Sequence, residues 1–582
     1  MASINLAGTF LASHGFDSWL LLFLAAILLV GGSQLRGSSQ DPREPPALKP
    51  KIPIVGHIIG LLGLRQYYYR QLGCVESHIL GFKFRPSETQ QLTRRVCDRC
   101  SQDNPNLPVF SISMGGSQKM YIIKDPQLSQ VAMRNKALSL IPFMAEFAEK
   151  MVGFGPNIMN LFHHPPTDGS LPWTDDQHRS YAPLSPGPDL LEMNTYVLKR
   201  ISRTINSVGP QFENKTLYLW LRDTFTKATL GSLFGDENSL TASPTLIQDL
   251  WDYDAGQSQL LMQPFPSITA RQAYGGRSRV QQALRKYFRE EFNQISNVSA
   301  VVKRRVAVNR KWGLPSDDVA DHEFGMLFAS VTNAIPTLFW MTCYVFRDPK
   351  LVEELRKELL DIAIIQDQDE TAADGQNGMQ LHWPRKCTFT VAKLSSACPL
   401  LLSTYKEVMR LTNRNAGTRR VVEDTVISYT PTPAVGETAA TQSYILKKGA
   451  NVQVPSIIAN FDPATWGPNA HEFDARRFLA VDKERERAQS RAFNPFGSGK
   501  HLCPGRFFAD AEILGALAAL ILGFEIETPE GGRVQVPPIK NNLAEAVPKP
   551  LQTVQDNMVV RIRRRPGWED VEWVFVTSNG KS

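Results

Sequence analysis

The sequence predicts a mainly α-helical protein with small β-sheets, organised as one large domain behind an N-terminal membrane anchor. Apolar residues recur at three- and four-residue spacing through most of the chain, which is the period of a helix with one buried face. Short β-branched segments occur late in the chain and predict the small sheets. No internal repeat and no second proline-rich linker follow Gly60, so we expect one large domain rather than the roughly four that length alone would suggest.

The composition is that of an ordinary globular protein. The 582 residues are 42% hydrophobic and 21% charged, which excludes a disordered or a fibrous chain. The net charge of +7 is too small and too dispersed for a nucleic-acid binder. The seven cysteines are scattered and odd in number, so we expect free thiols in a reducing compartment.

Residues 18–35 are the predicted anchor. The segment is uncharged and contains the run WLLLFLAAILLV. As a helix it would measure about 27 Å, against a bilayer core of ~30 Å. A cleaved signal would require a basic residue before the apolar segment, but no Lys or Arg precedes residue 18. Basic residues instead follow the segment. The positive-inside rule therefore predicts a single pass with the rest of the chain in the cytosol. The alternative interpretation is a buried apolar helix.

A proline-rich hinge, residues 37–60, separates the anchor region, residues 1–36, from the predicted catalytic domain, residues 61–582. Each proline removes a backbone donor and restricts the residue before it. We therefore expect residues 41–53 to be non-helical and to form a stiff spacer between the membrane and the catalytic domain.

Within the catalytic domain four segments show the helical period, and three short segments have the pattern of strands. The third helix has an acidic first turn, which suits the positive end of a helix dipole, and Asp348-Pro349 follows its end. Two polar stretches, 366–380 and 428–442, are interpreted as surface insertions. The predicted helices are 217–234, 280–295, 318–346 and 350–364, and the predicted strands are 420–428, 450–455 and 558–563.

One cysteine, Cys503, lies in a glycine-rich turn before a strongly apolar helix, in the segment FNPFGSGKHLCPGRFFA that begins at Phe493. Backbone N–H groups of such a turn and of the helix N-terminus stabilise a thiolate, and glycines let a flat cofactor approach the backbone closely. A buried structural cysteine needs neither feature. The pattern therefore favours a thiolate metal ligand.

This segment resembles the haem-ligand signature of the cytochrome P450 family, Phe-x-x-Gly-x-basic-x-Cys-x-Gly. Two further motifs occur in the order that this family shows. Glu407-x-x-Arg410 lies on a predicted helix, and Arg477 in the later motif NAHEFDARRF would complete a structural triad of one acid and two arginines. Ala475 stands where proline is usual. The signature positions are Phe496, Gly499, His501, Cys503 and Gly505.

The resemblance implies the cytochrome P450 fold and a haem b held between the long helix 318–346 and the cysteine turn. Cys503 would be the axial ligand of the iron, and Arg419 and His501 would pair with the haem propionates. The candidates for the tryptophan and the arginine that family members carry on their third helix are Trp173 and Arg179.

The long helix departs from the family pattern. Where most members have an acid and a hydroxyl that deliver protons, this chain has Thr332 and Asn333, followed by Pro336. The proline removes a backbone hydrogen bond near Thr332 and opens the helix there. The arrangement resembles the branch of sterol 7α-hydroxylases and prostacyclin synthase, which contains both oxygenases and an isomerase. The motif therefore does not separate the two chemistries.

The preferred hypothesis is a monooxygenase of the endoplasmic reticulum membrane. It would insert one oxygen atom from O2 into a hydrophobic small molecule, such as a secondary metabolite, a terpenoid or a sterol-like compound. NADPH would supply electrons through NADPH-cytochrome P450 reductase, docked on the basic side of the cysteine turn. Two alternatives remain open: a reductase-independent isomerase of a peroxide-type substrate, and a non-catalytic haem sensor or carrier. The anchor, hinge and insertions are also similar to those of enzymes of fungal secondary metabolism.

Overall fold

The computed structural model describes residues 41–48, 57, 107–114, 118–236, 238–294, 297–368, 383–431, 440–479, 482–539 and 545–576. The chain divides into two compact units: residues 1–139 with 416–459, and residues 140–415 with 460–582. The predicted anchor lies outside the described residues, as do most of the predicted hinge and most of both predicted insertions. In the described part of the hinge, residues 41–48 are not helical, as their prolines predict, whereas His57, which lies beyond the last proline of the hinge, is helical.

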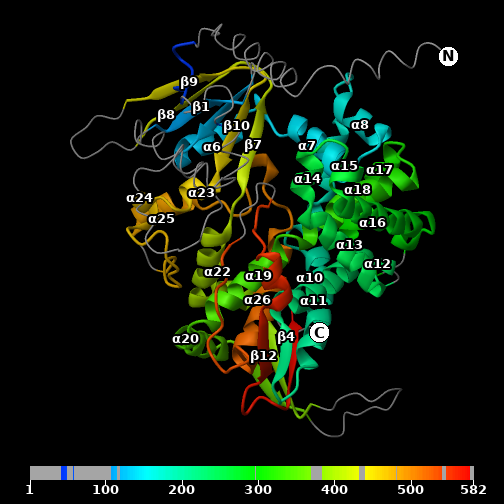
Figure 1. Ribbon diagram of the computed structural model, residues 1–582, viewed down its shortest axis with the longest axis vertical. Helices are drawn as coiled ribbons and strands as arrows, with labels where there is room; N and C mark the ends of the chain where they lie inside the picture. Colours follow the sequence, from blue (N-terminus) through cyan, green and yellow to red (C-terminus); the bar gives the residue numbers. More distant parts are fainter. Residues whose placement is uncertain are drawn as a thin grey trace, which may run out of the picture. The chain divides into compact units, whose positions relative to one another are not determined.

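The first unit is built on a mixed five-stranded sheet (Figure 1). Its strands are β1 (Val109–Ser113), β2 (Lys119–Ile123), β3 (Leu138–Ser139), β7 (Ala416–Val421) and β10 (Asn451–Pro455). A hairpin of β8 (Thr425–Tyr429) and β9 (Gln442–Leu446) and the helices α6 (Pro126–Arg134) and α23 (Ser456–Ala459) complete the unit. The strand order is β1-β2-β10-β7-β3, and β2 and β10 are parallel. The predicted strand 420–428 is wrong as a single strand, because a turn separates β7 from β8.

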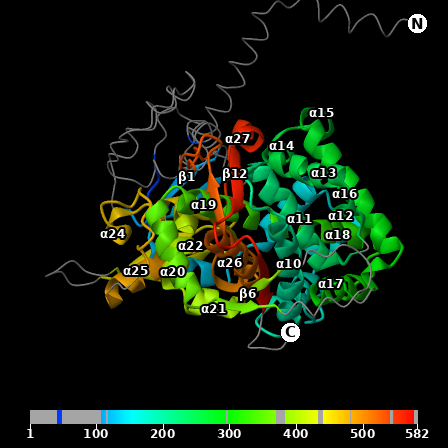
Figure 2. The same ribbon diagram turned by 90° about the horizontal axis from the view of Figure 1, so that it is seen from below.

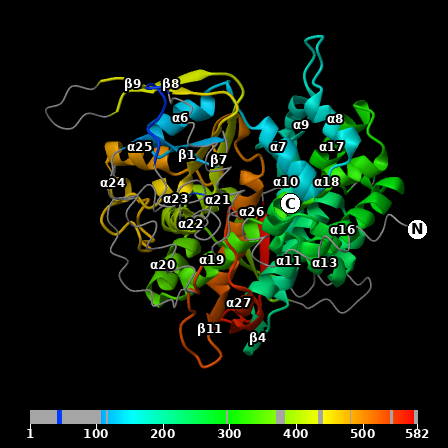
Figure 3. The ribbon, with the colours of Figure 1, turned by 45° about the horizontal axis from the view of Figure 1, so that its top comes forward.

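The second unit is mainly helical, as the sequence predicts (Figures 2 and 3). Its longer helices are α10 (Pro188–Asn206), α11 (Leu217–Phe234), α13 (Pro244–Ala255), α16 (Arg271–Arg289), α17 (Ala300–Lys311), α18 (Ser316–Val331), α19 (Ala334–Phe346), α20 (Pro349–Leu360), α22 (Pro399–Thr412), α25 (Lys483–Ala492) and α26 (Arg506–Gly523). Its shorter helices are α7 (Ile141–Phe147), α8 (Pro156–His163), α9 (Trp173–Ser180), α12 (Ser239–Ala242), α14 (Gln257–Met262), α15 (Pro266–Thr269), α21 (Val391–Ser396), α24 (Pro463–Trp466) and α27 (Gln552–Asn557).

Two three-stranded sheets accompany these helices. They have the orders β11-β12-β4 and β13-β6-β5. The strands are β4 (Glu213–Thr216), β5 (Ile364–Asp367), β6 (Arg385–Thr390), β11 (Phe524–Glu527), β12 (Val559–Arg564) and β13 (Val571–Val576). Strand β12 confirms the predicted strand 558–563 to within one residue at each end.

The core of the second unit surrounds α19 and α26, which are buried along most of their lengths and pack against each other. In Figure 2 the two helices lie near α22, with α10 and α11 beside them. Among the described residues, the run Ser316–Phe346 is the one helical stretch long and apolar enough to span a membrane. Because 72% of its apolar window is buried inside the protein, this run is a core element.

The helix boundaries agree with the prediction where local signals are strong. Helix α11 has the predicted bounds 217–234, and α20 begins at Pro349 behind the N-cap Asp348. The predicted helix 280–295 instead begins at Arg271 and ends at Arg289. The first half of α16 contains Gly276, a residue that disfavours a helix. In the structure this glycine lets α16 approach the backbone of α13, because a Cβ there would lie 2.4 Å from the Asp249 carbonyl oxygen.

Candidate functional site

The cysteine turn is a compact backbone structure held by glycines. Gly497 and Gly499 have φ values of 78° and 70°, which L side chains rarely adopt. The turn closes because the N–H of Cys503 donates to the carbonyl of Phe496 at 2.9 Å. Helix α26 begins directly afterwards, at Arg506. This geometry places the sulfur of Cys503 at the N-terminus of a long buried helix.

The environment of Cys503 is mixed. Burial raises the pKa of its thiol, whereas the backbone N–H groups of Gly505 and Arg506 and the charge of Arg506 oppose that rise. The expected stabilisation of a thiolate by the turn is therefore present, but the effect of burial on the pKa is larger. Of the four cysteines within the described ranges, all free, Cys503 alone is partly accessible. The other three are Cys343, Cys387 and Cys398.

The predicted long helix 318–346 is two helices. Residues Thr332 and Asn333 interrupt it between α18 and α19. The physical reason is Pro336, which has no N–H to donate to the Thr332 carbonyl. The opening expected there is confirmed, and it is large enough to end one helix and start another. Thr337 closes the new start, because both its N–H (3.2 Å) and its hydroxyl (2.8 Å) donate to the carbonyl of Asn333.

One face of this interrupted helix is open, although most of its residues are buried. Asn333 and Ala329 are exposed, whereas Thr332 is only 3% exposed. A Cβ added to Gly325 would meet nothing within 4 Å. These three open positions are spaced by four residues and therefore share one helix face. This open face and the Cys503 turn belong to the same unit.

The predicted triad residues come together in the second unit. Glu407 accepts from Arg410 at 2.8 Å on α22, and from Arg477 at 2.9 Å. All three side chains are almost completely buried. Arg410 also donates to the backbone carbonyls of Asn460 and Ala470, at 2.6 and 2.7 Å. Glu407 is thus paired with both arginines, and backbone carbonyls accept from their remaining N–H groups, as a buried ion cluster requires.

Arg419, the first predicted propionate partner, lies on β7 of the first unit. It is buried, and burial lowers the pKa of its guanidinium. It donates to the carbonyl of its neighbour Thr418 at 2.7 Å. Within the described part of the chain it makes no ion pair with a carboxylate. A buried cation of this kind fits an anionic group supplied from outside the chain.

The second predicted propionate partner, His501, faces a residue that the sequence reasoning missed. The rings of His501 and His178 of α9 are 6.3 Å apart, edge to face. One turn earlier on α9, Asp175 pairs with Lys500 at 2.8 Å. Asp175 and His178 are three residues apart, so they share one face of α9. This face contacts the cysteine turn, and the spacing of the two polar residues is the sequence feature that could have identified it.

Of the two candidates from the same helix, Trp173 is buried in another environment and Arg179 is at the surface. Trp173 is buried, and its indole N–H donates to the side-chain oxygen of Asn309 at 3.2 Å. Asn309 also contacts His322, whose pKa burial lowers to about 4. Arg179 is exposed. Trp173 therefore belongs to an internal polar network with α17 and α18.

Two acids of α26 follow the cysteine turn, Asp510 partly buried and Glu512 fully buried. Burial raises the pKa of Asp510 to about 6, and the hydroxyl of Tyr405 donates to this acid at 2.8 Å. Burial raises the pKa of Glu512 to about 8, and the hydroxyl of Thr229 donates to it at 2.9 Å. At neutral pH Glu512 is therefore mostly a neutral acid inside the core.

Comparison with known proteins identifies the family. The cytochrome P450 family profile matches residues 107–554. The chain belongs to the cytochrome P450 family. It is 31% identical to a cytochrome P450 monooxygenase of Gibberella zeae over 92% of each chain. It is 29% identical to a 25-hydroxycholesterol 7-alpha-hydroxylase of Rattus norvegicus over 41% of this chain and 54% of that one. These relatives place the protein near fungal P450 monooxygenases and the sterol 7α-hydroxylase branch, and make it a P450 enzyme of the monooxygenase kind.

The fold agrees with this family. The retinoic acid-bound cyanobacterial CYP120A1 superposes with a TM-score of 0.55 over 79% of this chain and 91% of that one, at 16% identity. Cytochromes P450 bind haem b through a cysteine thiolate, so haem b is the cofactor of this protein. The residues fit such a group. Cys503 is the accessible described cysteine, its turn carries no bulky side chain at Gly497 or Gly499, and the face of Ala329 and Asn333 is open.

Proposed function

We propose that this P450 is a membrane-bound monooxygenase that inserts one oxygen atom into a C–H bond of a hydrophobic small molecule. The other atom of O2 leaves as water, with two electrons from NADPH and two protons. The observation that carries the proposal is Cys503, partly accessible in a glycine turn at the head of α26. The haem supplies oxygen activation when bound, and the following roles are those of this chain's residues.

In this proposal Cys503 ligates the iron. Arg419 and His501 hold the two propionates, each through a charged or donating side chain directed at an anion. The triad Glu407, Arg410 and Arg477 acts structurally, because its charges are already paired with one another. The remaining signature positions, which would contact the haem through the backbone or a ring, are Phe496, Gly499 and Gly505.

We assign proton delivery to the interruption between α18 and α19. The Thr332 carbonyl accepts no hydrogen bond from position 336, and the exposed amide of Asn333 both donates and accepts. Together they can hold a water molecule between a donor and an acceptor. The usual threonine performs this task with one hydroxyl, so an asparagine is a chemically sufficient replacement.

The substrate is proposed to lie along the open face of Gly325, Ala329 and Asn333. The small side chains at the first two positions leave room for a rigid, bulky molecule, and the neighbouring core is apolar. The rat relative is named for a sterol, 25-hydroxycholesterol, and the Gibberella relative is a fungal enzyme. We therefore propose a terpenoid or sterol-like secondary metabolite as the substrate class.

The architecture proposed for the whole chain is an anchor region at 1–36 with the membrane helix 18–35, a hinge at 37–60, and a haem domain at 61–582. The anchor would hold the haem domain on the cytosolic side of the endoplasmic reticulum membrane. There it meets its electron donor, NADPH-cytochrome P450 reductase.

The test uses the full-length protein in microsomes with the reductase. The reduced CO complex should show the red-shifted Soret band of thiolate-ligated haem, and Cys503→Ser should lose it. The matched control is Cys398→Ser, a change at a buried cysteine outside the turn, which should keep the band. A band that survives in Cys503→Ser would contradict the assignment of the ligand.

Turnover measurements distinguish a monooxygenase from an isomerase and from a non-catalytic haem protein. A monooxygenase forms product only with NADPH and reductase, and the oxygen of 18O2 appears in the product. Product formed from a peroxide-type substrate without NADPH would instead establish an isomerase. Absence of any ligand-induced spin change over a broad panel of hydrophobic compounds would favour a sensor or carrier.

A further inference from the structure

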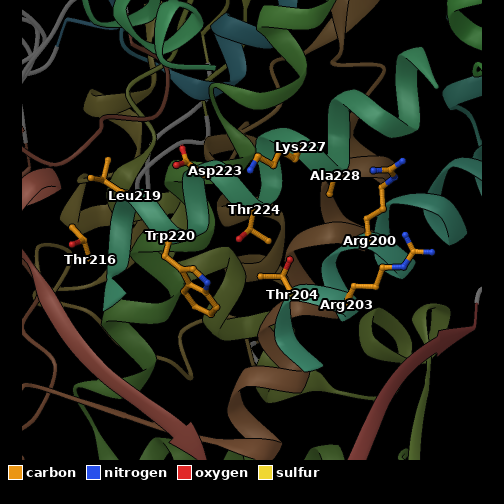
Figure 4. A pocket seen from close by; sticks show the side chains of 10 residues that line it. All are labelled: Arg200, Arg203, Thr204, Thr216, Leu219, Trp220, Asp223, Thr224, Lys227 and Ala228. Carbon is orange, nitrogen blue, oxygen red and sulfur yellow. The ribbon is translucent and has the colours of Figure 1, made fainter. Parts of the chain in front are cut away.

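A cavity of about 570 Å³ lies between α10 and α11 of the second unit (Figure 4). No residue of the cysteine turn, α18 or α19 lines it. Its walls are one stripe of each helix, since residues three and four positions apart share a helix face. The side chains that matter below are Arg200, Arg203 and Thr204 of α10, and Trp220, Thr224 and Lys227 of α11.

Two charged residues of this cavity are already neutralised by protein partners. Arg200 forms an ion pair with Asp236 and lies over the ring of Tyr196, 4.9 Å from its centroid. Asp223 pairs with its neighbour Arg222 at 2.8 Å. These two pairs contribute no net charge to the cavity.

The other two charged residues leave the cavity with a net charge of about +2. In the described part of the chain, neither Arg203 nor Lys227 makes an ion pair or a side-chain hydrogen bond, and both side chains are exposed. In Figure 4 the Arg203 guanidinium and the Lys227 ammonium point to different sides of the cavity. Because both side chains are exposed and come from different helices, each can turn towards a ligand that lies between them, at Thr204 and Thr224. A dianion matches this charge, whereas a single carboxylate leaves one cation unpaired.

Hydroxyl groups and an aromatic ring complete the cavity. Thr204 and Thr224 face each other from the two helices in Figure 4, and neither hydroxyl has a hydrogen-bond partner among the described residues. Trp220 lies towards the other end, half-buried, and stacks with no other described aromatic ring. The two threonines thus lie between the cationic side chains of Arg203 and Lys227, and Trp220 offers a flat apolar surface beside them.

We propose that this cavity binds an organic phosphate. A phosphate monoester carries close to two negative charges at neutral pH and several acceptor oxygens, which suits Arg203, Lys227 and the two threonine hydroxyls. Inorganic phosphate alone would fill only a small part of a cavity of typical ligand size, so the organic group occupies the remainder against Trp220. This site is separate from the haem, and it does not rest on the proposed oxygenation.

The same chemistry can come from a soluble phosphate ester or from the headgroup of an acidic phospholipid at the membrane. The experiment therefore has two arms, both with full-length haem protein. In the first, isothermal titration calorimetry measures binding of phenyl phosphate, with inorganic phosphate and benzoate for comparison. In the second, the protein is sedimented with phosphatidylcholine vesicles that contain or lack phosphatidic acid.

The diagnostic variant is the double change Arg203→Glu and Lys227→Glu, and the matched control is Lys199→Glu, an exposed lysine of α10 that does not line the cavity. We expect phenyl phosphate to bind the wild type and the control alike, and the double variant about 100-fold more weakly. Trp220→Leu should weaken phenyl phosphate while leaving inorganic phosphate unchanged. Haem content, measured by the CO spectrum, should be normal in every variant.

The outcomes are decisive in both directions. If only vesicles with phosphatidic acid bind, with the same dependence on Arg203 and Lys227, the phosphate belongs to a lipid and the site stands. If no probe binds at millimolar concentration, or if Lys199→Glu weakens binding as much as the double variant, the site does not exist. A double variant that loses its haem is replaced by Thr224→Val with Arg203→Gln, which must weaken phenyl phosphate for the proposal to hold.

Discussion

Adjacent arginines of one loop should respond oppositely to replacement by alanine. Arg477→Ala should yield little folded haem protein, whereas Arg476→Ala should be close to wild type. The two residues have the same chemistry and the same place in the chain, but differ in burial. The Arg477 side chain is 1% exposed, whereas Arg476 is 55% exposed and pairs with Glu354, itself 42% exposed.

The magnitude follows from what each guanidinium contacts. Arg477 donates to Glu407 at 2.9 Å, so its loss breaks a buried ion pair, at a cost of about 3–5 kcal/mol. It also removes three hydrogen bonds from a charged donor to backbone carbonyls, each worth about 1.5–3 kcal/mol. Against a total stability of about 5–15 kcal/mol, this removes most of the margin. By contrast, a surface pair such as that of Arg476 contributes about 0–1 kcal/mol. The carbonyls that accept from Arg477 belong to Trp466 (2.7 Å), Asn469 (3.0 Å) and Glu472 (3.0 Å).

The assay expresses both variants in parallel and measures haem per mole of protein from the CO spectrum. The thermal midpoint is then recorded at one fixed scan rate, because a protein of this size often unfolds irreversibly. Normal haem content and midpoint in Arg477→Ala would refute the reasoning. Equal losses in the two variants would refute it as well, since burial would then not be the determining difference.

Three further changes test other parts of the second unit. Asn333→Ala should keep haem and substrate binding but slow product formation by about 10²- to 10⁴-fold. It should also lower the product formed per NADPH, with peroxide released, and wild-type coupling would remove Asn333 from proton delivery. Glu512→Gln should be more stable relative to the wild type at pH 8 than it is at pH 5. The folded pKa of Glu512, about 8, exceeds its unfolded value of 4.5, so the folded protein binds the extra proton and stability falls by roughly 1 kcal/mol per pH unit between these values. Chemical denaturation at several pH values measures the free energy of unfolding. If Glu512 were charged in the folded protein, this free energy would change with pH equally in the variant and the wild type. Gly523→Ala should destabilise by about 1–3 kcal/mol or more, because the new Cβ would lie 1.9 Å from the buried ring of Trp573, whereas Gly325→Ala, with nothing within 4 Å, should not. Equal midpoints for these two glycine variants would contradict the packing.

The chemistry of this protein was most predictable where it is encoded in consecutive residues. The cysteine turn needs only glycines at two positions with positive φ and one backbone hydrogen bond to Cys503, all within ten residues. Glu407 and Arg410 are three positions apart on one helix, so their pairing follows from helical spacing. Their partner Arg477 could be assigned only through the family motif, because nothing local in the sequence brings it to α22.

What the sequence did not reveal depends on how distant segments pack. The approach of His178 to His501 requires α9 to lie against the cysteine turn, and hydrophobic periodicity does not encode that contact. The cavity at Arg203 and Lys227 requires two helix stripes to face each other across a gap. The helix break was half predicted: Pro336 indicated an opening, but a residue pattern cannot distinguish a kink from two separate helices.

The interruption at Asn333 is a local departure from a regular helix, between two largely buried helices. A proline inside a continuous helix costs about 3 kcal/mol, so Pro336 disfavours an unbroken helix and lies instead in the first turn of α19, where proline is tolerated. Packing on the C-terminal side makes the break rigid. Thr337 closes the start of α19 on the Asn333 carbonyl, and Trp340 one turn later donates to the Pro548 carbonyl at 2.7 Å. A group that relays protons works only when it is held in place beforehand, and these contacts fix Asn333 without using its side chain. The amide therefore remains free to bind water, which is the condition that the proposed role in proton delivery requires.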